Sequence, residues 1–276
     1  MKKLLMFLSV MLIVIGSLVT VPAKADMMYG VRGTFGLGEP ADLITIDPVT
    51  GALDSVIGLT GMTGVGGLAI NPIDGTIYAV GGGDGTAGLH TLDPTTGAAT
   101  LVGGGVTVSD MGFDSSGTLY AVMADDGTGT WGELATIDLT DGSITSIGGS
   151  FLGGIGVAFD SNDTLYIKLI DVLYTVDETN SDILTTVALD RFLYNSLAID
   201  ADDTLYSTDW LAESQIVTID PITGATTDLP GTVPLLDGDI YISALDFSRA
   251  VPEPSTMLLL GTGLVGLAGF RRKFRS

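Results

Sequence analysis

The stretch GLAINPIDGTIYAVGGGDGTAGLHTLDPTTGAATLVGG, residues 67–104, decides the fold of this chain. It holds four short runs of apolar and β-branched residues, separated by turns rich in Gly, Asp, Asn and Pro. Such runs are typical of short β-strands joined by tight turns. The stretch therefore predicts one small sheet of four antiparallel strands.

The same unit recurs along the chain, so the fold is built from repeats. The second strand of the unit recurs as TIYAV (76–80), TLYAV (118–122), TLYIK (164–168) and TLYST (204–208). The third strand and its turn recur as LITIDPVTG (43–51), LHTLDPTTG (89–97), LATIDLTDG (134–142), LYTVDETNS (173–181) and IVTIDPITG (216–224). The first strand recurs as GLAIN (67–71), DMGFD (110–114), GVAFD (156–160), SLAID (196–200) and SALDF (243–247). Four strands in about 45 residues is the size of one β-propeller blade.

The two ends of the repeat series complement each other. The first copy begins at Met28, with the second strand of the unit, whereas the last copy stops after its first strand, Ile242 to Phe247. A blade assembled from both ends would close a ring and leave no open sheet edge. We therefore predict an all-β fold over residues 26–250, a five-bladed β-propeller of four-stranded blades with one blade closed by N- and C-terminal strands. A linear β-solenoid is the alternative, but it would not need these complementary truncations.

The DPxTG segments have the composition of tight turns. Their Asp can accept hydrogen bonds from turn amides, their Pro presets φ, and their Gly supplies a positive φ. The fourth copy, Asp177 to Ser181, lacks both Pro and Gly. We expect that hairpin to be the loosest of the five.

The N-terminus has the order of a secretory signal peptide. Lys2 and Lys3 precede an apolar run from Leu4 to Val21, and Ala23 and Ala25 form a small-x-small cleavage site. This order predicts a signal peptide over residues 1–25 that is cleaved after Ala25. An uncleaved membrane anchor is the alternative, because the apolar run is long.

The charge of the body excludes one large class of function. Residues 26–250 hold 32 acidic and four basic residues, a net charge of −28. Such a body repels phosphate backbones, so nucleic-acid binding is excluded, while solubility and attraction of cations are favoured. The chain has no cysteine, which excludes thiol chemistry and cysteine-ligated metals.

We find no catalytic constellation. His90 is the single histidine, and the equivalent residues of the other copies are Ile44, Ala135, Tyr174 and Val217, which predicts a packing position. With one His and no Cys, His-based triads and His-rich zinc sites cannot be assembled.

Acidic turns raise a calcium hypothesis. Asp200, Asp202 and Asp203 place carboxylates within a few residues, as hard cations require. Similar groups occur at 160–163 and 237–239. None fits the EF-hand loop, and Asp is also an ordinary turn residue. Calcium is therefore the one cofactor considered, and no other is expected.

One face of the propeller is a candidate ligand surface. The loops from second to third strands and those between blades share a face, where exposed aromatic residues beside acids can hold sugars or cations. Packing of these side chains in the channel or between blades is the alternative. The candidates are Asp125, Asp126, Trp131, Tyr194, Asp209, Trp210 and Glu213.

The C-terminal segment VPEPSTMLLLGTGLVGLAGFRRKFRS, residues 251–276, has three parts. A Pro-Glu-Pro motif is followed by an apolar segment from Met257 to Phe270 and then by a basic cluster. The prolines keep the junction extended, the apolar segment predicts a short transmembrane helix, and the cations stay on the cytoplasmic side. The motif residues are Pro252, Glu253 and Pro254, and the cluster is Arg271, Arg272, Lys273 and Arg275.

This tail resembles the PEP-CTERM sorting signal of bacterial proteins that are processed by an exosortase. The resemblance implies a Gram-negative envelope, recognition at Pro252, Glu253 and Pro254, transient anchoring in the inner membrane, and removal of the tail. It also implies a place at the outer cell surface or in the extracellular matrix, in association with exopolysaccharide or biofilm. A plain C-terminal membrane anchor is the alternative.

The sequence as a whole favours an exported protein that is not an enzyme. We expect a binding or structural propeller whose partners are the exosortase, the membrane before processing, and exopolysaccharide or another surface protein. The alternative is a calcium-dependent, lactonase-like propeller hydrolase, which needs several acidic or amide side chains converging on the axis. The innermost strands offer mostly Ala, Met, Val, Phe and Leu there, which disfavours it.

Overall fold

The computed structural model describes residues 26–34, 40–82, 87–124, 132–151, 153, 156–209, 215–234 and 240–248. The predicted signal peptide, its cleavage residues Ala23 and Ala25, and the whole sorting tail lie outside the described residues. No helix among the described residues is long and apolar enough to cross a membrane.

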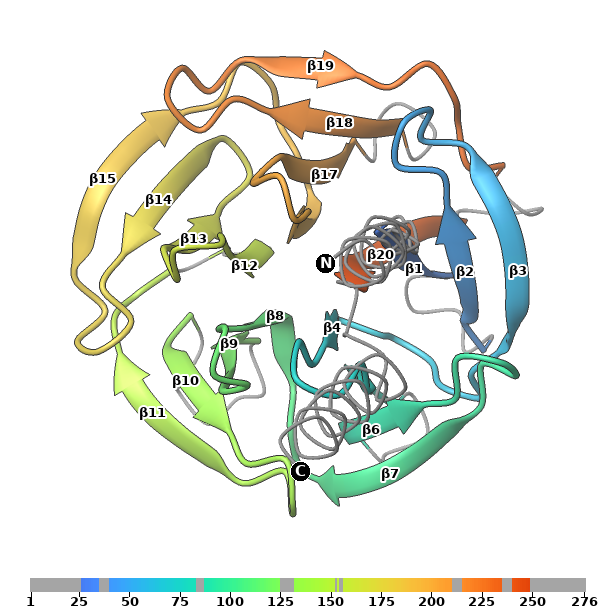
Figure 1. Ribbon diagram of the computed structural model, residues 1–276. Coiled ribbons are helices and arrows are strands. Elements are labelled where there is room, and N and C mark those ends of the chain that lie inside the picture. The colour runs from blue at the N-terminus through green and yellow to red at the C-terminus, as the bar shows by residue number, and fades with distance from the viewer. Residues whose placement is uncertain are drawn as a thin grey trace, which may run out of the picture.

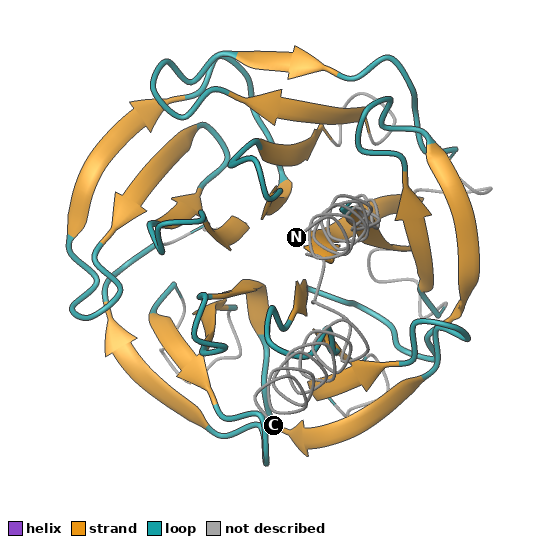
Figure 2. Cartoon of the chain, in the orientation of Figure 1, coloured by secondary structure: helices purple, strands orange, loops and turns teal. Residues whose placement is uncertain are grey.

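The described residues form five antiparallel sheets of four strands arranged around one axis (Figure 1). Figure 2 shows only strands, loops and turns in the described part of the chain. The prediction of an all-β, five-bladed propeller is confirmed. Blade 1 is β20 (Ile240–Ser248), β1 (Met27–Thr34), β2 (Asp42–Ile46) and β3 (Leu53–Leu59).

The other four blades run from the axis outward in chain order. Blade 2 is β4 (Gly67–Ile70), β5 (Ile77–Gly81), β6 (Gly88–Leu92) and β7 (Ala99–Gly104). Blade 3 is β8 (Val108–Phe113), β9 (Leu119–Met123), β10 (Leu134–Ile137) and β11 (Ile144–Gly148). Blade 4 is β12 (Gly156–Phe159), β13 (Leu165–Lys168), β14 (Val172–Val176) and β15 (Ile183–Ala188). Blade 5 is β16 (Asn195–Ile199), β17 (Leu205–Asp209), β18 (Gln215–Ile219) and β19 (Thr226–Asp228).

The ring closes in blade 1, where strands from both ends of the chain pair. The N-terminal strand β1 pairs antiparallel with β20, as the complementary truncations predicted. The register differs by one residue from the sequence alignment, which equated Phe247 with Asn71. Phe247 lies opposite Met28, just as Ile70 lies opposite Ile77, so Phe247 is the equivalent of Ile70. Both Phe247 and Ile70 are buried, and a slip of one residue would have turned Phe247 to the other face.

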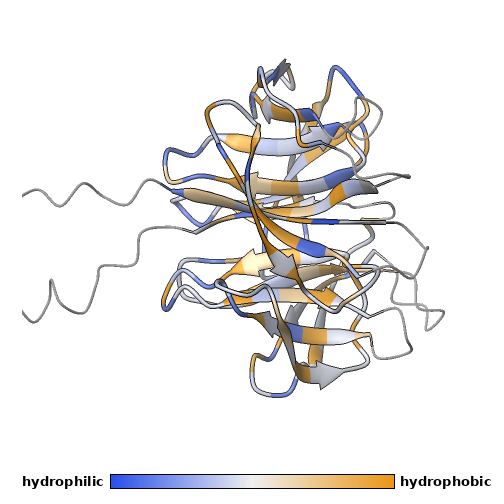
Figure 3. Ribbon diagram, turned by 90° about the vertical axis from the view of Figure 1, so that its right-hand side faces the viewer, coloured by the Kyte–Doolittle hydropathy of each residue, from blue (hydrophilic) through white to orange (hydrophobic). Residues whose placement is uncertain are grey.

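Burial falls from the axis to the rim. The innermost strand β4 is buried along its whole length, whereas most residues of the outermost strand β15 are exposed. Figure 3 shows the propeller from the side, with hydrophobic and hydrophilic residues interleaved along the strands.

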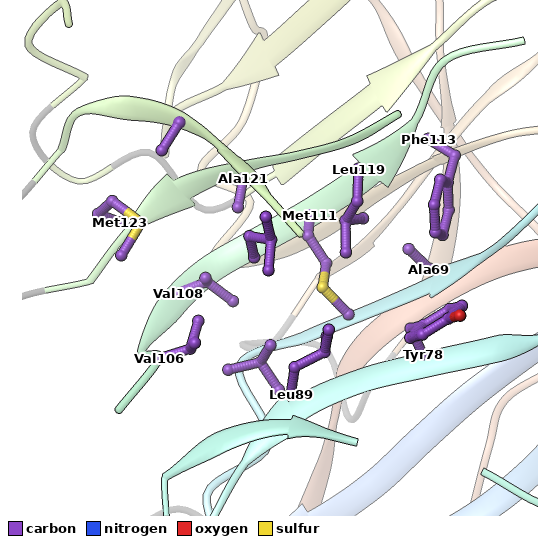
Figure 4. Packing of buried hydrophobic residues seen from close by; sticks show 13 residues of the cluster. Ala69, Tyr78, Leu89, Val106, Val108, Met111, Phe113, Leu119, Ala121 and Met123 are labelled. Carbon is purple, nitrogen blue, oxygen red and sulfur yellow. The ribbon is translucent and has the colours of Figure 1, made fainter. Parts of the chain in front are cut away.

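The core consists of five apolar clusters, each shared by two neighbouring blades. Between blades 2 and 3, Met111 packs among Tyr78, Leu89 and Leu119 (Figure 4). Each blade therefore has apolar residues on both faces of its sheet. This explains why the strands are continuous apolar runs and do not strictly alternate between apolar and polar residues.

The Tyr of the TLY motif links one blade to the next. Its ring meets the aromatic residue of the next innermost strand, in the tilted arrangement that aromatic pairs prefer. The centroid distances are 5.7 Å for Tyr78–Phe113, 5.0 Å for Tyr120–Phe159 and 5.0 Å for Tyr206–Phe247.

The DPxTG segments form the predicted turns. In the first copy the Asp47 Oδ1 atom accepts hydrogen bonds from the amides of Val49 and Thr50, at 2.8 and 3.2 Å. Gly51 closes the turn with a φ of 73°. In the fourth copy Ser181 takes the Gly position with a φ of 62°, a conformation that strains an L-residue with a side chain.

We predict that Ser181→Gly raises the free energy of unfolding by about 1 kcal/mol, because Gly adopts a positive φ without the steric penalty of a Cβ. The reverse change at the equivalent position of the third copy, Gly142→Ser, should destabilise the protein, because φ there is 73° and an added Cβ would lie no closer than 3.1 Å to its neighbours. Urea denaturation measures both, and a loss of stability in Ser181→Gly would contradict the assignment of strain.

A second prediction concerns acid. Hydrogen bonds from turn residues hold the pKa values of Asp47, Asp93, Asp138, Asp177 and Asp220 below their usual value. A depressed pKa in the folded state gives stability that is present above the unfolded-state pKa of about 3.9 and is lost as pH falls through the folded-state value. The free energy of unfolding should therefore drop on acidification below about pH 4.

Replacing all five with Asn tests this, because Asn keeps the accepting oxygen but does not titrate. The five-fold variant should lose less stability than the parent chain between about pH 5 and about pH 2, the range in which carboxylates titrate. Equal slopes for the variant and the parent chain would show that these turns do not carry the acid sensitivity.

Candidate functional site

The innermost strands crowd around the axis. A Cβ added to Gly112 would lie 2.8 Å from the Val157 oxygen, and one added to Gly156 would lie 2.6 Å from the Leu197 Cβ. Only small residues fit such contacts. At one equivalent position the five strands therefore carry Gly67, Gly156, Ser196, Ala244 and, as the exception, Asp110.

Asp110 is the acidic exception, and it reaches across the axis. Its Oδ2 atom accepts hydrogen bonds from the amides of Val157 and Leu197, both at 3.1 Å, and from the Ser196 hydroxyl at 3.2 Å. These partners belong to blades 4 and 5, so one carboxylate joins three blades. The residue is fully buried, and burial raises its pKa well above the usual value against the effect of these hydrogen bonds.

Two further side chains continue this link around the ring. The Ser196 hydroxyl accepts a hydrogen bond from the Leu245 amide at 3.0 Å. The Asp246 Oδ2 atom accepts one from the Ile70 amide at 2.7 Å. An innermost strand has a ladder partner on one side only, so amides on its other edge need such acceptors.

Lys168 is buried beside this network. Its ammonium group donates to the Leu193 carbonyl at 2.9 Å, and no part of the residue is exposed. Burial lowers its pKa to about 7, while the charge of Asp110 acts in the opposite direction.

Asp110 and Lys168 were not singled out from the sequence, although the repeat contained the signal. Asp110 stands where the other copies have Gly, Ser or Ala, and Lys168 stands where two copies have Val80 and Val122. From the sequence we expected mostly apolar side chains at the axis, and we missed Asp110, which lies there on β8.

Above the network lies a cavity of about 320 Å³, here called the central funnel. Residues of blades 1, 2, 3 and 5 line it, most of them at the starts of the innermost strands and the others on neighbouring segments of blades 1 and 3. None of its lining residues among those described is charged. The lining residues are Gly33, Ala41, Gly64, Val65, Gly66, Val108, Ser109, Ala124, Tyr194, Asn195, Ser196, Tyr241 and Ser243. A much smaller space of about 30 Å³, bordered by Asp246, lies at the other end of these strands.

The predicted ligand surface is described only in part. Tyr194 lines the central funnel. Asp209 lies at the end of β17, where its Oδ2 atom is 3.5 Å from an Arg191 guanidinium nitrogen. The other predicted residues lie outside the described part of the chain: Asp125, Asp126, Trp131, Trp210 and Glu213.

The calcium candidates are engaged in turns. Asp200 accepts hydrogen bonds from the amides of Asp202 and Thr204 and from the Tyr206 hydroxyl, at 2.9 to 3.0 Å. Asp203 instead accepts from the amide and hydroxyl of Ser161 in blade 4, both at 2.7 Å. Within the described residues, no three acidic or histidine side chains are grouped as a metal site. These bonds are those of turn carboxylates, and calcium stays a hypothesis.

His90 lies on β6 opposite Ala79, at the position that the repeat predicted. It is 9% exposed, and its Nδ1 atom is 3.0 Å from the Gly88 carbonyl oxygen. This environment is that of a packed side chain.

Comparison with known proteins identifies the tail and the fold. Residues 250–273 match the family described as the PEP-CTERM protein-sorting motif. Such a motif implies export, sorting to the surface and processing by an exosortase. A search of curated proteins found no match.

Among solved structures, the fold is similar to a chain of the nidogen/laminin complex, with a TM-score of 0.59 and 12% identity over 82% of this chain and 99% of that one. A protein of unknown function from Bacteroides caccae has a TM-score of 0.48 and 12% identity, over 82% of this chain and 100% of that one. Glutaminyl cyclase of Myxococcus xanthus has a TM-score of 0.44 and 16% identity, over 71% and 74%. At these identities the first likeness shows a shared propeller fold alone.

The axial network generates a prediction about stability. Asp110→Ala should lower the free energy of unfolding by about 3 kcal/mol or more, because it leaves two buried amides without an acceptor. Asp110→Asn keeps an accepting oxygen at the same place and should lose clearly less.

Both variants remove the carboxyl group near Lys168, so their difference isolates the hydrogen bonds across the axis. Chemical denaturation of the two proteins side by side measures it. Equal losses in the two variants would show that these bonds contribute little.

Proposed function

We propose that this exported chain is a non-catalytic binding or structural propeller of the outer cell surface or extracellular matrix, delivered there by exosortase sorting. The observation that carries the proposal is the Asp110 carboxylate on the propeller axis, bonded to amides of two other blades. A propeller hydrolase of the lactonase type would need that place for its calcium ion.

The chemistry at the axis does not fit a cation. Calcium needs several oxygen ligands, whereas the groups bonded to the Asp110 Oδ2 atom are N–H and O–H donors. The Oδ1 atom is buried without a partner among the described side chains, so Asp110 has one oxygen left and not a set of ligands. The second acid of the innermost strands, Asp246, is likewise bonded to the Ile70 amide. The arrangement suits a carboxylate that joins blades, and this supports a structural role for the channel.

The net negative charge of residues 26–250 supports a location outside the cell in a hydrated matrix. Of the three described cations, Lys168 is buried, Arg32 forms a 2.8 Å ion pair with Asp42, and Arg191 forms a 2.6 Å ion pair with Asp228. The remaining charged side chains of the described surface are acidic. Such a surface favours solubility and attracts counter-ions. We propose exopolysaccharide or another surface protein as the partner in this setting.

The test follows the protein from export to activity. In a host with an exosortase, the full chain should reach the surface fraction, and a variant with Ala at Pro252, Glu253 and Pro254 should stay in the membrane fraction. Protein recovered from the surface should contain less than one calcium ion per chain and show no turnover of lactone or ester substrates.

Two results would overturn the proposal. One is a tightly bound, stoichiometric calcium ion together with lactone turnover, which would support the hydrolase. The other is equal surface delivery of the chain with and without its Pro-Glu-Pro motif.

A further inference from the structure

The described residues that line the central funnel are uncharged, although the chain as a whole is strongly acidic. The body holds 32 acidic residues, yet no described lining residue is charged. Asp110, which follows the lining residue Ser109, is fully buried, with its Oδ2 atom bonded to blades 4 and 5 and its Oδ1 atom without a partner. A cation would find no carboxylate ligand in this lining, and an anion would have to approach through an acidic surface.

The polar groups of the lining are hydroxyls and one amide. They belong to Ser109, Tyr194, Asn195, Ser196, Tyr241 and Ser243. Hydroxyls both donate and accept hydrogen bonds, and tyrosine adds an apolar ring to its hydroxyl. This mixture of aromatic rings with uncharged donors and acceptors matches the surface of a neutral sugar.

Asn195 is the part of the lining that points to a ligand. Its backbone is fixed, because its carbonyl accepts a hydrogen bond from the Ser207 hydroxyl at 2.9 Å. Its side-chain Nδ2 atom, however, is buried and has no hydrogen-bond partner. The residue directly across the ladder, Thr208, also has a buried hydroxyl without a partner. Buried polar groups are normally hydrogen-bonded. An amide donor and a hydroxyl without partners at the wall of a cavity therefore indicate a polar ligand.

Blades 2 and 3 repeat this feature near the same cavity. Thr63 and Thr107 occupy equivalent positions, since their carbonyls accept the amides of Gly82 and Ala124 after the second strand of each blade. Each precedes a lining residue, and the hydroxyl of each is buried without a partner. Four of the six buried side-chain atoms that lack a partner among the described residues thus lie on or beside residues at the funnel. The other two are Arg32 Nε and Asp110 Oδ1, whose residues are the chain neighbours of the lining residues Gly33 and Ser109.

We propose that the central funnel binds a neutral, hydroxyl-rich ligand of one or two sugar rings, such as the end of an uncharged polysaccharide chain. A volume of about 320 Å³ is at the small end of ligand pockets. The inference rests on the proposed function, because it names the ligand class of a propeller that binds without converting its ligand.

The experiment titrates the mature protein, as recovered from the surface fraction, with defined probes in a calorimeter. The neutral probes are cellotriose, maltotriose and mannotriose, and the charged probes are tri-galacturonic acid and calcium chloride. At least one neutral trisaccharide should bind saturably, and the charged probes should not compete with it.

Two variants locate the site, and one serves as a matched control. Asn195→Ala should raise the dissociation constant roughly tenfold, the effect of one lost hydrogen bond that is well placed. Gly64→Asn should also weaken binding, because Gly64 lines the funnel and a side chain there would occupy part of its volume. The protein should still fold, since a Cβ at this position meets nothing within 4 Å and Asn tolerates the positive φ of 57°. Asn162→Ala, an exposed change on the opposite, turn-bearing face, should leave binding unchanged. Thermal melting checks that each variant is folded.

The outcomes separate this inference from the proposed function. If no neutral trisaccharide binds, or if binding is indifferent to both funnel variants, the inference is wrong while a non-catalytic surface propeller stands. Binding of tri-galacturonic acid or calcium that depends on Asn195 would also overturn it. If a neutral sugar binds at the funnel and is cleaved, the ligand class stands and the non-catalytic function fails.

Discussion

The pairing of β1 with β20 turns a row of blades into a ring. Each apolar cluster of the core needs two blades, so an open row would leave one face of its first blade and one face of its last blade uncovered. The pairing brings the beginning and the end of the described chain into one sheet, and β20 supplies residues that pack against blade 5. Closure therefore completes the last interface between blades and removes the open ends.

Closure around five blades also sets the chemistry of the axis. The innermost strands lie so close together that their equivalent positions are restricted to small residues, apart from one. Their inner edges carry backbone amides that have no partner in the sheet, and buried amides need hydrogen-bond acceptors. Asp110, Ser196 and Asp246 meet that demand across four pairs of strands. The backbone amides at the axis are thus satisfied by side chains of neighbouring blades.

The same axis divides the molecule into two ends with different character. At one end, the turns between first and second strands are dominated by Asp and by hydrogen bonds such as that from Ser161 to Asp203. At the other end, the central funnel collects uncharged hydroxyls, tyrosines and open polar atoms. Among the described residues, no acidic side chain lines the central funnel.

The sequence by itself determined the number of blades, the four strands of each blade, the turns and the closure by both termini, because each depends on local patterns that recur in the repeat. It also determined the sorting tail, whose three parts are contiguous. Only the tertiary structure decided the register of Phe247, the place of Asp110 on the axis, and the funnel with Asn195 in its wall. The physical reason is that these features depend on which residues of different blades face one another, and that arrangement is fixed by ring closure between segments more than 200 residues apart, such as Tyr29 and Asp246.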